Sequence, residues 1–431
     1  MNETSLPSSG AQARRSFLKT AGATAAAASM VHTVGAKAKE GVIKVALIGC
    51  GGRGSGAANQ AMSADPGVKL WAMADMFADR LESSHKNLKK QKGDQVDVPE
   101  DRRFLGIDAY KKVMESDVDV VLLTTPPHFR PLHLEAAVKA DKHIFCEKPM
   151  AVDGPGIRMA MAAVAESKKT DKNLVCGFCW RYHMPKRGLY EQVLENGLIG
   201  DVRAVYNTYQ TGPTWAKDRR EEWSDLEFQL RNWVQMPWLS GDHITEQAVH
   251  SIDMMSWAFG DAKVKSVSGN GGRQVYNEEK YGNCYDHFGV VYDYEDGRKG
   301  IHLSRKIPGC TSSYECDIVG QDGNALAMKA LIKKGDEVAW RYKGPTPNMY
   351  QVEHDELFAS IRKGGEPINN GDWMMNSTTL AVMGRIACYT GKTITYDQML
   401  KSEMSYEPAH WDFEKPLPLA DVPMPGKMKF S

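Results

Sequence analysis

Hydrophobic residues between positions 42 and 179 fall into short runs of strand length, separated by segments in which apolar residues recur at helical spacing. Parallel strands need a crossover connection, which a helix usually supplies, so this alternation predicts an α/β fold with a doubly wound parallel sheet. The expected strands are Val42–Ile48, Val68–Ala74, Val118–Thr124, His143–Cys146 and Leu174–Cys179. The expected helices cover residues 54–63, 78–90, 110–115, 131–139 and 155–169.

After about residue 180 the apolar runs lengthen and alternate in part, and aromatic residues become dense. Runs of this kind, joined by turns such as Glu295-Asp296-Gly297, predict a second, α+β region with a mainly antiparallel sheet. Its strands are expected at 202–210, 264–269, 284–294, 300–306 and 314–319, and its helices at 185–196, 245–259, 350–363 and 373–389. The Pro-rich chain beyond Lys401 is expected to be irregular.

Composition narrows the classes of partner. The 431 residues include 54 basic and 54 acidic side chains, so no excess positive charge is available to bind nucleic acid. The sequence contains no run of about 18 apolar residues, so no membrane-spanning helix is expected. Most of the eight cysteines lie in apolar runs, which favours buried free thiols. Cys176 and Cys179 have the spacing of a redox motif but lie in an expected strand, so neither redox chemistry nor a metal site is expected.

The strongest motif is Gly49-Cys50-Gly51-Gly52-Arg53-Gly54, which follows the first strand and opens a helix. Gly49 suits a tight turn, Gly51 lets the backbone approach a pyrophosphate, and Gly54 lets helix and strand pack closely. Asp75 ends the second strand, where a carboxylate binds a ribose 2′-hydroxyl and repels a 2′-phosphate. This context predicts a Rossmann domain that binds NAD rather than NADP. The alternative is an ordinary Gly-rich turn with Asp75 as a helix cap.

Two loops follow later strands of the same sheet. Thr125, Pro126 and His128 follow the third strand and are expected to line the nucleotide crevice, although a Pro-stiffened turn would occupy the same position. The loop Glu147-Lys148-Pro149 follows the fourth strand. A lysine at this point can lie beside the nicotinamide, hydrogen-bond the reacting hydroxyl and stabilise negative charge on its oxygen.

These elements, in this order, resemble the glucose–fructose oxidoreductase/inositol dehydrogenase family (Gfo/Idh/MocA) over about residues 42–396. The resemblance implies an N-terminal Rossmann domain and a C-terminal α/β domain with a large open sheet. It also implies that Lys148 contacts the substrate and that Glu147 and Arg181 belong to the cofactor site, with Arg181 reaching the substrate too. Glu147 is the residue expected to position its loop.

Glu246 and His250 are four residues apart in an expected helix, which would place them on one face. Members of the family often carry an Asp-x-x-x-His pair here, with the histidine as proton acceptor. With Glu at the first position, Glu246 could orient His250 or bind a substrate hydroxyl. The alternative is a capped helix with a satisfied histidine.

An aromatic group follows the Rossmann region. Tyr182 and His183, next to Arg181, are candidate substrate-binding residues, because rings pack on sugar C–H faces and polar side chains bind hydroxyls. Packing of the core or of a subunit interface explains the group equally well. The tryptophans of this group are Trp180, Trp215, Trp223, Trp233 and Trp238.

The first residues have the parts of an export signal peptide, in the usual order. Arg14-Arg15 precede an Ala-rich apolar stretch, and Gly35-Ala36-Lys37-Ala38 offers a cleavage site. The pattern is typical of a bacterial twin-arginine signal peptide over residues 1–38, although a surface helix starting with two arginines would also contain it. An exported dehydrogenase would have to hold its nicotinamide cofactor tightly, because a periplasm has no soluble pool of it.

The sequence therefore predicts an exported or periplasmic oxidoreductase that moves a hydride from a sugar, polyol or glycoside hydroxyl to bound NAD. A second sugar or a redox acceptor would reoxidise the cofactor. The alternatives are an NAD-dependent glycosidase, which oxidises, eliminates and re-reduces, and a non-catalytic sugar or nucleotide sensor. A homo-oligomer is expected. The expected regions are a Rossmann domain at 41–172, a substrate and oligomerisation domain at 173–400, and a tail at 401–431.

Overall fold

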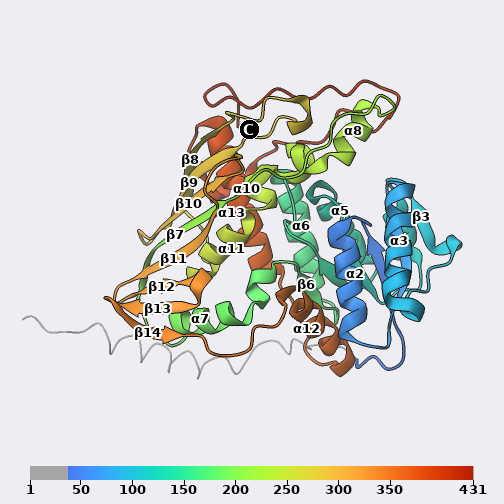
Figure 1. Cartoon of the computed structure of the whole chain (residues 1–431), viewed down its shortest axis with the longest axis horizontal. Helices are drawn as coiled ribbons and strands as arrows, with labels where there is room; N and C mark the ends of the chain where they lie inside the picture. Colours follow the sequence, from blue (N-terminus) through green and yellow to red (C-terminus); the bar gives the residue numbers. More distant parts are fainter. Residues whose placement is uncertain (1–36, 431) are drawn as a thin grey trace, which may run out of the picture.

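The computed structural model describes residues 37–430 and contains two sheets with helices packed against them (Figure 1). The twin-arginine pattern lies outside the described residues. Within residues 37–430, no helix is both long enough and apolar enough to cross a bilayer. All eight cysteines fall in this part as free thiols, and seven are buried, which confirms the interpretation made from their apolar surroundings.

The first sheet has six parallel strands in the order β3-β2-β1-β4-β5-β6, as the strand–helix alternation predicted. Its carboxyl edge is where ligands bind in such sheets, next to the strands at which the order reverses, β1 and β4. The strands are β1 Ile43–Ile48, β2 Val68–Asp75, β3 Arg103–Leu105, β4 Val120–Leu123, β5 His143–Cys146 and β6 Leu174–Cys176. The helices are α2 Gly52–Ala64, α3 Ala78–Lys92, α4 Ala109–Glu115, α5 Arg130–Lys139 and α6 Gly154–Ser167.

The second sheet has nine strands in the order β14-β13-β12-β11-β7-β10-β9-β8-β15. Every neighbouring pair is antiparallel except β10 with β7, which confirms a mainly antiparallel sheet. Its strands are β7 Val202–Gln210, β8 Ser266–Gly272, β9 His287–Asp293, β10 Lys299–Arg305, β11 Ser313–Gly320, β12 Asn324–Leu326, β13 Leu331–Lys334, β14 Glu337–Arg341 and β15 Ile394–Thr395.

Helices cover one face of this second sheet (Figure 1). The helices α11 (Val249–Ala258) and α13 (Gly371–Thr390) pack on it, and α13 also contacts α6 of the first sheet. The helix α12 (Met349–Lys363) packs on α2 instead, so the two halves share an extensive core. The remaining helices are α7 Met184–Leu194, α8 Asp225–Arg231, α9 Pro237–Ser240, α10 Asp242–Glu246 and α14 Tyr396–Lys401.

The chain between β7 and α9 leaves the second sheet and reaches the first. Phe228 and Leu230 of this segment are buried in a small apolar cluster with Phe77 and Phe129 of the Rossmann part. Trp411 and other residues of the C-terminal tail pack on the same cluster. The tail is irregular, as its proline content predicted, and runs beside α8 (Figure 1). This third cluster joins segments that lie far apart in the sequence.

Candidate active site

The turn between β1 and α2 is built from glycines for two different reasons. Gly49 has φ +99°, and a Cβ there would lie 2.7 Å from the Thr125 nitrogen. A Cβ on Gly54 would lie 2.0 Å from the Gly49 carbonyl oxygen, so Gly49 and Gly54 close the turn. A Cβ on Gly51 or Gly52 would meet nothing within 4 Å. These middle glycines therefore border open space in front of the α2 N-terminus, the place a pyrophosphate takes in such turns.

Asp75 is fastened to the same turn. Its Oδ2 accepts a hydrogen bond of 2.6 Å from the Cys50 nitrogen, and its Oδ1 accepts one of 2.9 Å from the Phe77 nitrogen. Burial raises the pKa of this carboxyl group, while the two backbone donors oppose the rise. Each oxygen keeps a lone pair that can accept a ribose hydroxyl.

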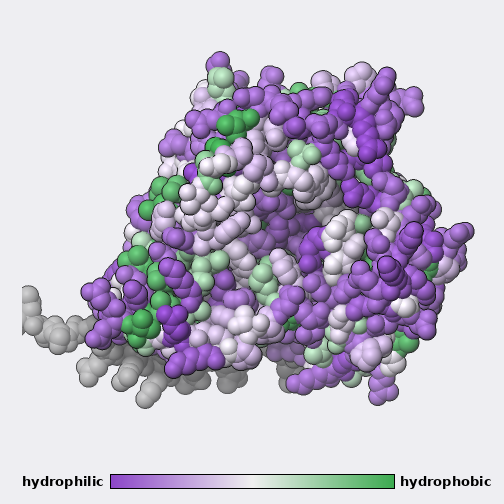
Figure 2. Space-filling view, in the orientation of Figure 1, coloured by the Kyte–Doolittle hydropathy of each residue, from purple (hydrophilic) through white to green (hydrophobic). Residues whose placement is uncertain are grey.

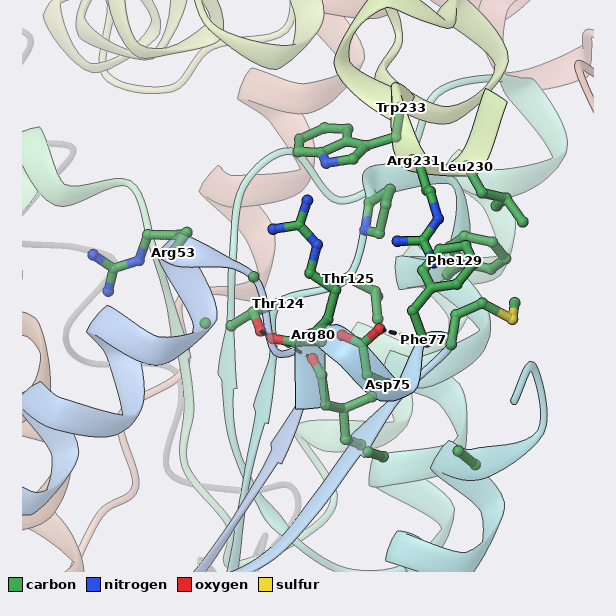
Figure 3. Close-up of a pocket in the computed structure, with 18 of the residues that line it drawn as sticks. Arg53, Asp75, Phe77, Arg80, Thr124, Thr125, Phe129, Leu230, Arg231 and Trp233 are labelled. Atoms are coloured by element: carbon green, nitrogen blue, oxygen red, sulfur yellow. Dashed lines mark hydrogen bonds between the residues drawn. The ribbon is translucent and has the colours of Figure 1, made fainter. Parts of the chain in front are cut away.

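A pocket of about 460 Å³ opens at the carboxyl edge of the six-stranded sheet. Figure 3 shows Asp75, Thr124 and Thr125 on one side of it and Leu230, Arg231 and Trp233 on the other. Eight of the expected cofactor residues line it, namely Gly49, Gly51, Gly52, Arg53, Gly54, Asp75, Thr125 and Pro126. The open glycine cradle and the tethered carboxylate fit a nicotinamide dinucleotide at this pocket.

Other expected cofactor residues lie elsewhere. His128 is not in the pocket wall. Its ring packs on two tryptophan rings, with ring centres 5.2 Å apart for Trp238 and 5.9 Å apart for Trp411. Glu147 is not in the pocket wall either; its Oε1 pairs with Arg53 Nε at 2.7 Å. Its Oε2 accepts a 3.1 Å hydrogen bond from the Lys148 nitrogen, so Glu147 links the nucleotide turn to the Lys148 loop.

The pocket wall also contains residues that sequence reasoning missed. Arg80 is five residues after Asp75 in the first helix turn of α3, so a general search for cations near the ribose site could have found it. Of the others, some lie in the Rossmann part but belong to no motif that marks them, and the rest come from a distant segment. Trp215 and Trp233, expected at a sugar site or in packing, line this nucleotide pocket instead. The remaining missed residues include Phe77, Tyr110, Phe129, His133, Lys217, Leu230 and Arg231.

Lys148 and Glu246 meet beyond the end of β5. The Lys148 Nζ donates to Glu246 Oε1 at 3.0 Å and also to the Glu246 carbonyl oxygen. Both side chains are 13% exposed, so the pair is largely shielded yet reachable. The peptide bond from Lys148 to Pro149 is cis. Arg130 donates to the carbonyls of Thr125 and Pro149 and thereby ties this loop to the one after β4.

His250 lies beside this ion pair in a low-dielectric setting. Burial, and secondarily the Lys148 charge, lower its pKa well below the ordinary value, so the imidazole is neutral at neutral pH. Its ring lies 5.3 Å from the Trp180 ring and 6.0 Å from the Phe178 ring, between centroids. The buried Nδ1 has no hydrogen-bond partner within residues 37–430. A neutral imidazole without a partner next to an ammonium can accept a proton from a bound hydroxyl.

The expectation that Glu246 and His250 share one helix face is wrong. Glu246 ends α10 and His250 belongs to α11, with a turn between them. In a continuous helix the Glu246 carbonyl would accept the His250 N–H. Here that carbonyl accepts Lys148 Nζ, and the His250 nitrogen donates to the Gln247 carbonyl at 3.3 Å. The helix is interrupted here because the Lys148 side chain, distant in the sequence, occupies the carbonyl that would accept the helical hydrogen bond.

Arg181 is held by two carboxylates. Its Nε donates to Asp253 at 3.0 Å and its Nη1 to Asp261 at 2.9 Å, and its guanidinium lies 4.1 Å from the centre of the Trp373 ring. The side chain is 9% exposed and is not in the wall of the nucleotide pocket. This geometry assigns Arg181 to the scaffold that carries α11, which in turn carries His250.

The neighbours of Arg181 differ from each other. The buried Tyr182 hydroxyl donates to Asn370 Oδ1 at 2.7 Å, which is a structural contact. Burial and the Lys186 charge lower the pKa of His183 to about 4, and its Nδ1 has no hydrogen-bond partner within the described chain.

Figure 2 shows a hollow lined mainly by hydrophilic residues between the nine-stranded-sheet half and the Rossmann half, where a polar substrate could enter.

The glycine turn, the tethered Asp75 and the pocket at the sheet edge define a dinucleotide-binding protein of the dehydrogenase type. Comparison with known proteins makes this specific. The model "Oxidoreductase family, NAD-binding Rossmann fold" matches residues 43–178, and "Oxidoreductase family, C-terminal alpha/beta domain" matches residues 191–395. The chain belongs to this family, Gfo/Idh/MocA, and is an NAD-binding oxidoreductase.

Curated relatives and solved structures agree with this assignment. Inositol 2-dehydrogenase of Salmonella typhimurium is 22% identical over 77% of this chain and 89% of its own. Myo-inositol 2-dehydrogenase of Thermotoga maritima is 26% identical over 66% of this chain and 75% of its own. The fold is similar to aldose–aldose oxidoreductase from Caulobacter crescentus, with TM-score 0.64 and 20% identity over 82% of this chain and 99% of that one. It is also similar to scyllo-inositol dehydrogenase from Lactobacillus casei with NAD(H) and scyllo-inositol bound, with TM-score 0.62 and 18% identity over the same shares.

Proposed function

We propose that this protein oxidises a secondary hydroxyl of a sugar or polyol with NAD, at the site formed by Lys148, His250 and Glu246. The observation that carries the proposal is the neutral, unpartnered His250 beside the Lys148 ammonium. The names of the similar proteins, which are inositol dehydrogenases and an aldose oxidoreductase, support a polyhydroxylated substrate.

Each residue has one task in this reaction. Lys148 Nζ donates a hydrogen bond to the reacting oxygen and stabilises its developing negative charge. His250 takes the hydroxyl proton as the carbon–oxygen double bond forms. Glu246 holds the ammonium in place through its carboxylate and its carbonyl. NAD, when bound, supplies the carbon that accepts the hydride from the carbinol carbon.

A substrate panel tests this proposal. Purified protein loaded with NAD is mixed with inositols, aldoses and aryl glycosides, while reduced nicotinamide and released aglycone are both followed. We expect lasting reduction of the nicotinamide by at least one polyol or sugar and no aglycone release. Release of aglycone without lasting reduction would instead establish the glycosidase cycle. Absence of any reaction, with NAD bound, would favour a sensor.

We also propose that the chain is exported through the twin-arginine route with its cofactor tightly held. The support is the sequence pattern around Arg14 and Arg15 alone. Replacing both arginines with lysine should leave folded protein in the cytoplasm, as cell fractionation would show. Unchanged export of the double variant would overturn this part of the proposal.

A homo-oligomer is proposed from the uncovered face of the nine-stranded sheet. Tyr206, Val291 and Ile301 are 37%, 36% and 38% exposed there, on three strands that lie side by side in the sheet. A second copy would bury this apolar face. Light scattering of the purified protein would measure its mass, and a monomer at micromolar concentration would contradict the proposal.

A further inference from the structure

The segment 211–236, called the strap from here on, connects β7 to α9 and forms one wall of the nucleotide pocket. Although it belongs to the second half of the chain, its Trp215, Lys217, Arg231 and Trp233 line the pocket together with the β1–α2 turn and Asp75. Figure 3 shows Trp233 and Arg231 facing Asp75 across the cavity, with Arg80 extending toward Trp233. The pocket is therefore closed by a piece of chain that a Rossmann domain by itself does not contain.

Arg231 fastens the strap to the first sheet. Its Nη1 pairs with Asp79 at 3.1 Å, and its guanidinium lies 4.0 Å from the centre of the Phe77 ring. Its Nε pairs with Glu227 on the same helix at 2.7 Å, which holds the side chain in this direction. Asp79 and Phe77 both follow Asp75 at the start of α3, so the fastening lies at the ribose end of the pocket.

The C-terminal tail backs the strap from the outside. Gln229 Nε2 donates to the Leu417 carbonyl at 2.7 Å, and the Leu417 nitrogen donates to Asp225 Oδ2 at 2.8 Å. The apolar cluster beneath α8 includes Leu226 and Phe228. The strap is thus held on three sides: by the sheet, by its own cluster and by the tail.

Two cationic side chains of this pocket wall, Arg80 and Lys217, are available to bind a ligand. Neither Arg80 nor Lys217 has an ion pair or a side-chain hydrogen bond within residues 37–430; Lys217 lies 5.8 Å from the Trp215 ring centre. Burial and the charges of Arg80 and Arg231 lower the Lys217 pKa, and the charge of Asp79 opposes this only in part, so Lys217 is repelled by the cations around it. A ligand that brings negative charge and a flat π face relieves this repulsion and gives the tryptophans and guanidinium a surface for stacking.

We propose that the strap clamps the adenosine half of the dinucleotide, with Trp215, Trp233 and Arg80 against the adenine and Lys217 near its phosphate, and that it slows release of the cofactor. This inference rests on the proposed function, since it assumes that the pocket binds NAD. It assigns retention of the cofactor to the second domain, and it gives a physical source for the tight binding that a secreted enzyme would need.

The rate of NAD release tests the strap. Full-length protein is loaded with radiolabelled NAD, chased with excess unlabelled NAD, and sampled over time. Trp215→Ala removes a pocket-lining ring that is 48% exposed, so its loss should not disturb folding. Asp79→Ala removes the fastening from the other side. We expect Trp215→Ala to release NAD about tenfold faster, the scale of one lost stacking contact, and Asp79→Ala, whose carboxylate is 61% exposed, to release it about two- to fivefold faster.

A matched control comes from the same segment. Arg220 has a side chain that is 66% exposed, pairs with Glu222 and does not line the pocket, so Arg220→Ala should release NAD at the wild-type rate. The double variant with Asp79→Ala and Arg231→Ala should release NAD no faster than Arg231→Ala alone, because both remove one fastening. Wild-type release rates in Trp215→Ala and Asp79→Ala would overturn the inference. Failure of the wild-type protein to bind NAD would instead overturn the proposed function.

Discussion

At the residue scale, the surroundings of each polar group decide its role more than its type does. His250 and Arg181 were both expected at the site; Arg181 is buried and His250 is half-buried. His250 has no hydrogen-bond partner for its Nδ1 within the described chain, whereas Arg181 is saturated by Asp253 and Asp261. An unsatisfied neutral base is available for chemistry, while a saturated cation is available only for structure.

Glu246 is expected to position Lys148 rather than to act as the base. Glu246→Gln keeps one oxygen that can accept from the Lys148 Nζ, so turnover should fall by less than the about 10²–10⁴-fold typical of losing a general base. Steady-state kinetics with the best substrate of the panel would measure this. A loss as large as that of His250→Ala would mean that the carboxylate itself takes the proton.

Arg181→Ala should destabilise the protein without emptying the nucleotide pocket. It leaves Asp253, which is fully buried, without its counter-ion, and breaking a buried pair in this way costs about 3–5 kcal/mol. Chemical unfolding would give the change in free energy, and NAD content per folded chain should stay at the wild-type value. Loss of NAD with unchanged stability would place Arg181 in the cofactor site after all. Arg203→Ala, at a side chain 59% exposed, is the surface control.

At the scale of elements, the sequence pattern predicted those helices, strands and turns that are set by residues close together in the chain. The β1–α2 turn and the buried strands of the first sheet follow from glycine positions and apolar runs, and the structure has them. The short strand β3 has three residues, too few to leave a pattern. The break between α10 and α11 could not be predicted, because Lys148, 98 residues away from Glu246, takes the carbonyl that a helix would use. The strap and the tail likewise depend on contacts between distant segments.

The glycine turn gives a prediction that separates folding from binding. Gly54→Ala places a methyl group 2.0 Å from the Gly49 carbonyl oxygen and should destabilise the turn. Gly51→Ala meets no protein atom within 4 Å, so it should fold normally but weaken NAD binding by about tenfold or more. Thermal unfolding and NAD titration of both variants would show this difference. Normal NAD affinity in Gly51→Ala would contradict the placement of the pyrophosphate.

At the scale of the whole molecule, buried neutral histidines tie stability to pH. Burial lowers the pKa of His302 to about 3, whereas an unfolded histidine titrates near 6.5. As pH falls below about 6.5, His302 takes up a proton in the unfolded chain but stays neutral in the folded chain. The free energy of unfolding therefore falls. The loss amounts to about 1.4 kcal/mol per pH unit for each such histidine until the folded pKa is reached.

Replacing His302 with Asn should flatten this dependence. Between about pH 6 and pH 4 the variant should lose about 1.4 kcal/mol less per pH unit than the wild-type protein. Urea unfolding at several pH values measures both slopes, and values at pH 7.5 give the cost of the substitution itself. Equal slopes in the two proteins would show that His302 is protonated in the folded state.

The central claim is that Lys148 and His250 act together on a hydroxyl beside a bound nicotinamide. Single-turnover reduction of protein-bound NAD by its best polyol or sugar tests it most directly, with bound NAD counted in every sample. Lys148→Ala and His250→Ala should each keep NAD and lose about 10²–10⁴-fold in rate. The double variant should be little slower than either, because residues that act as one unit are not additive. A near-normal rate in His250→Ala with NAD bound would contradict the account.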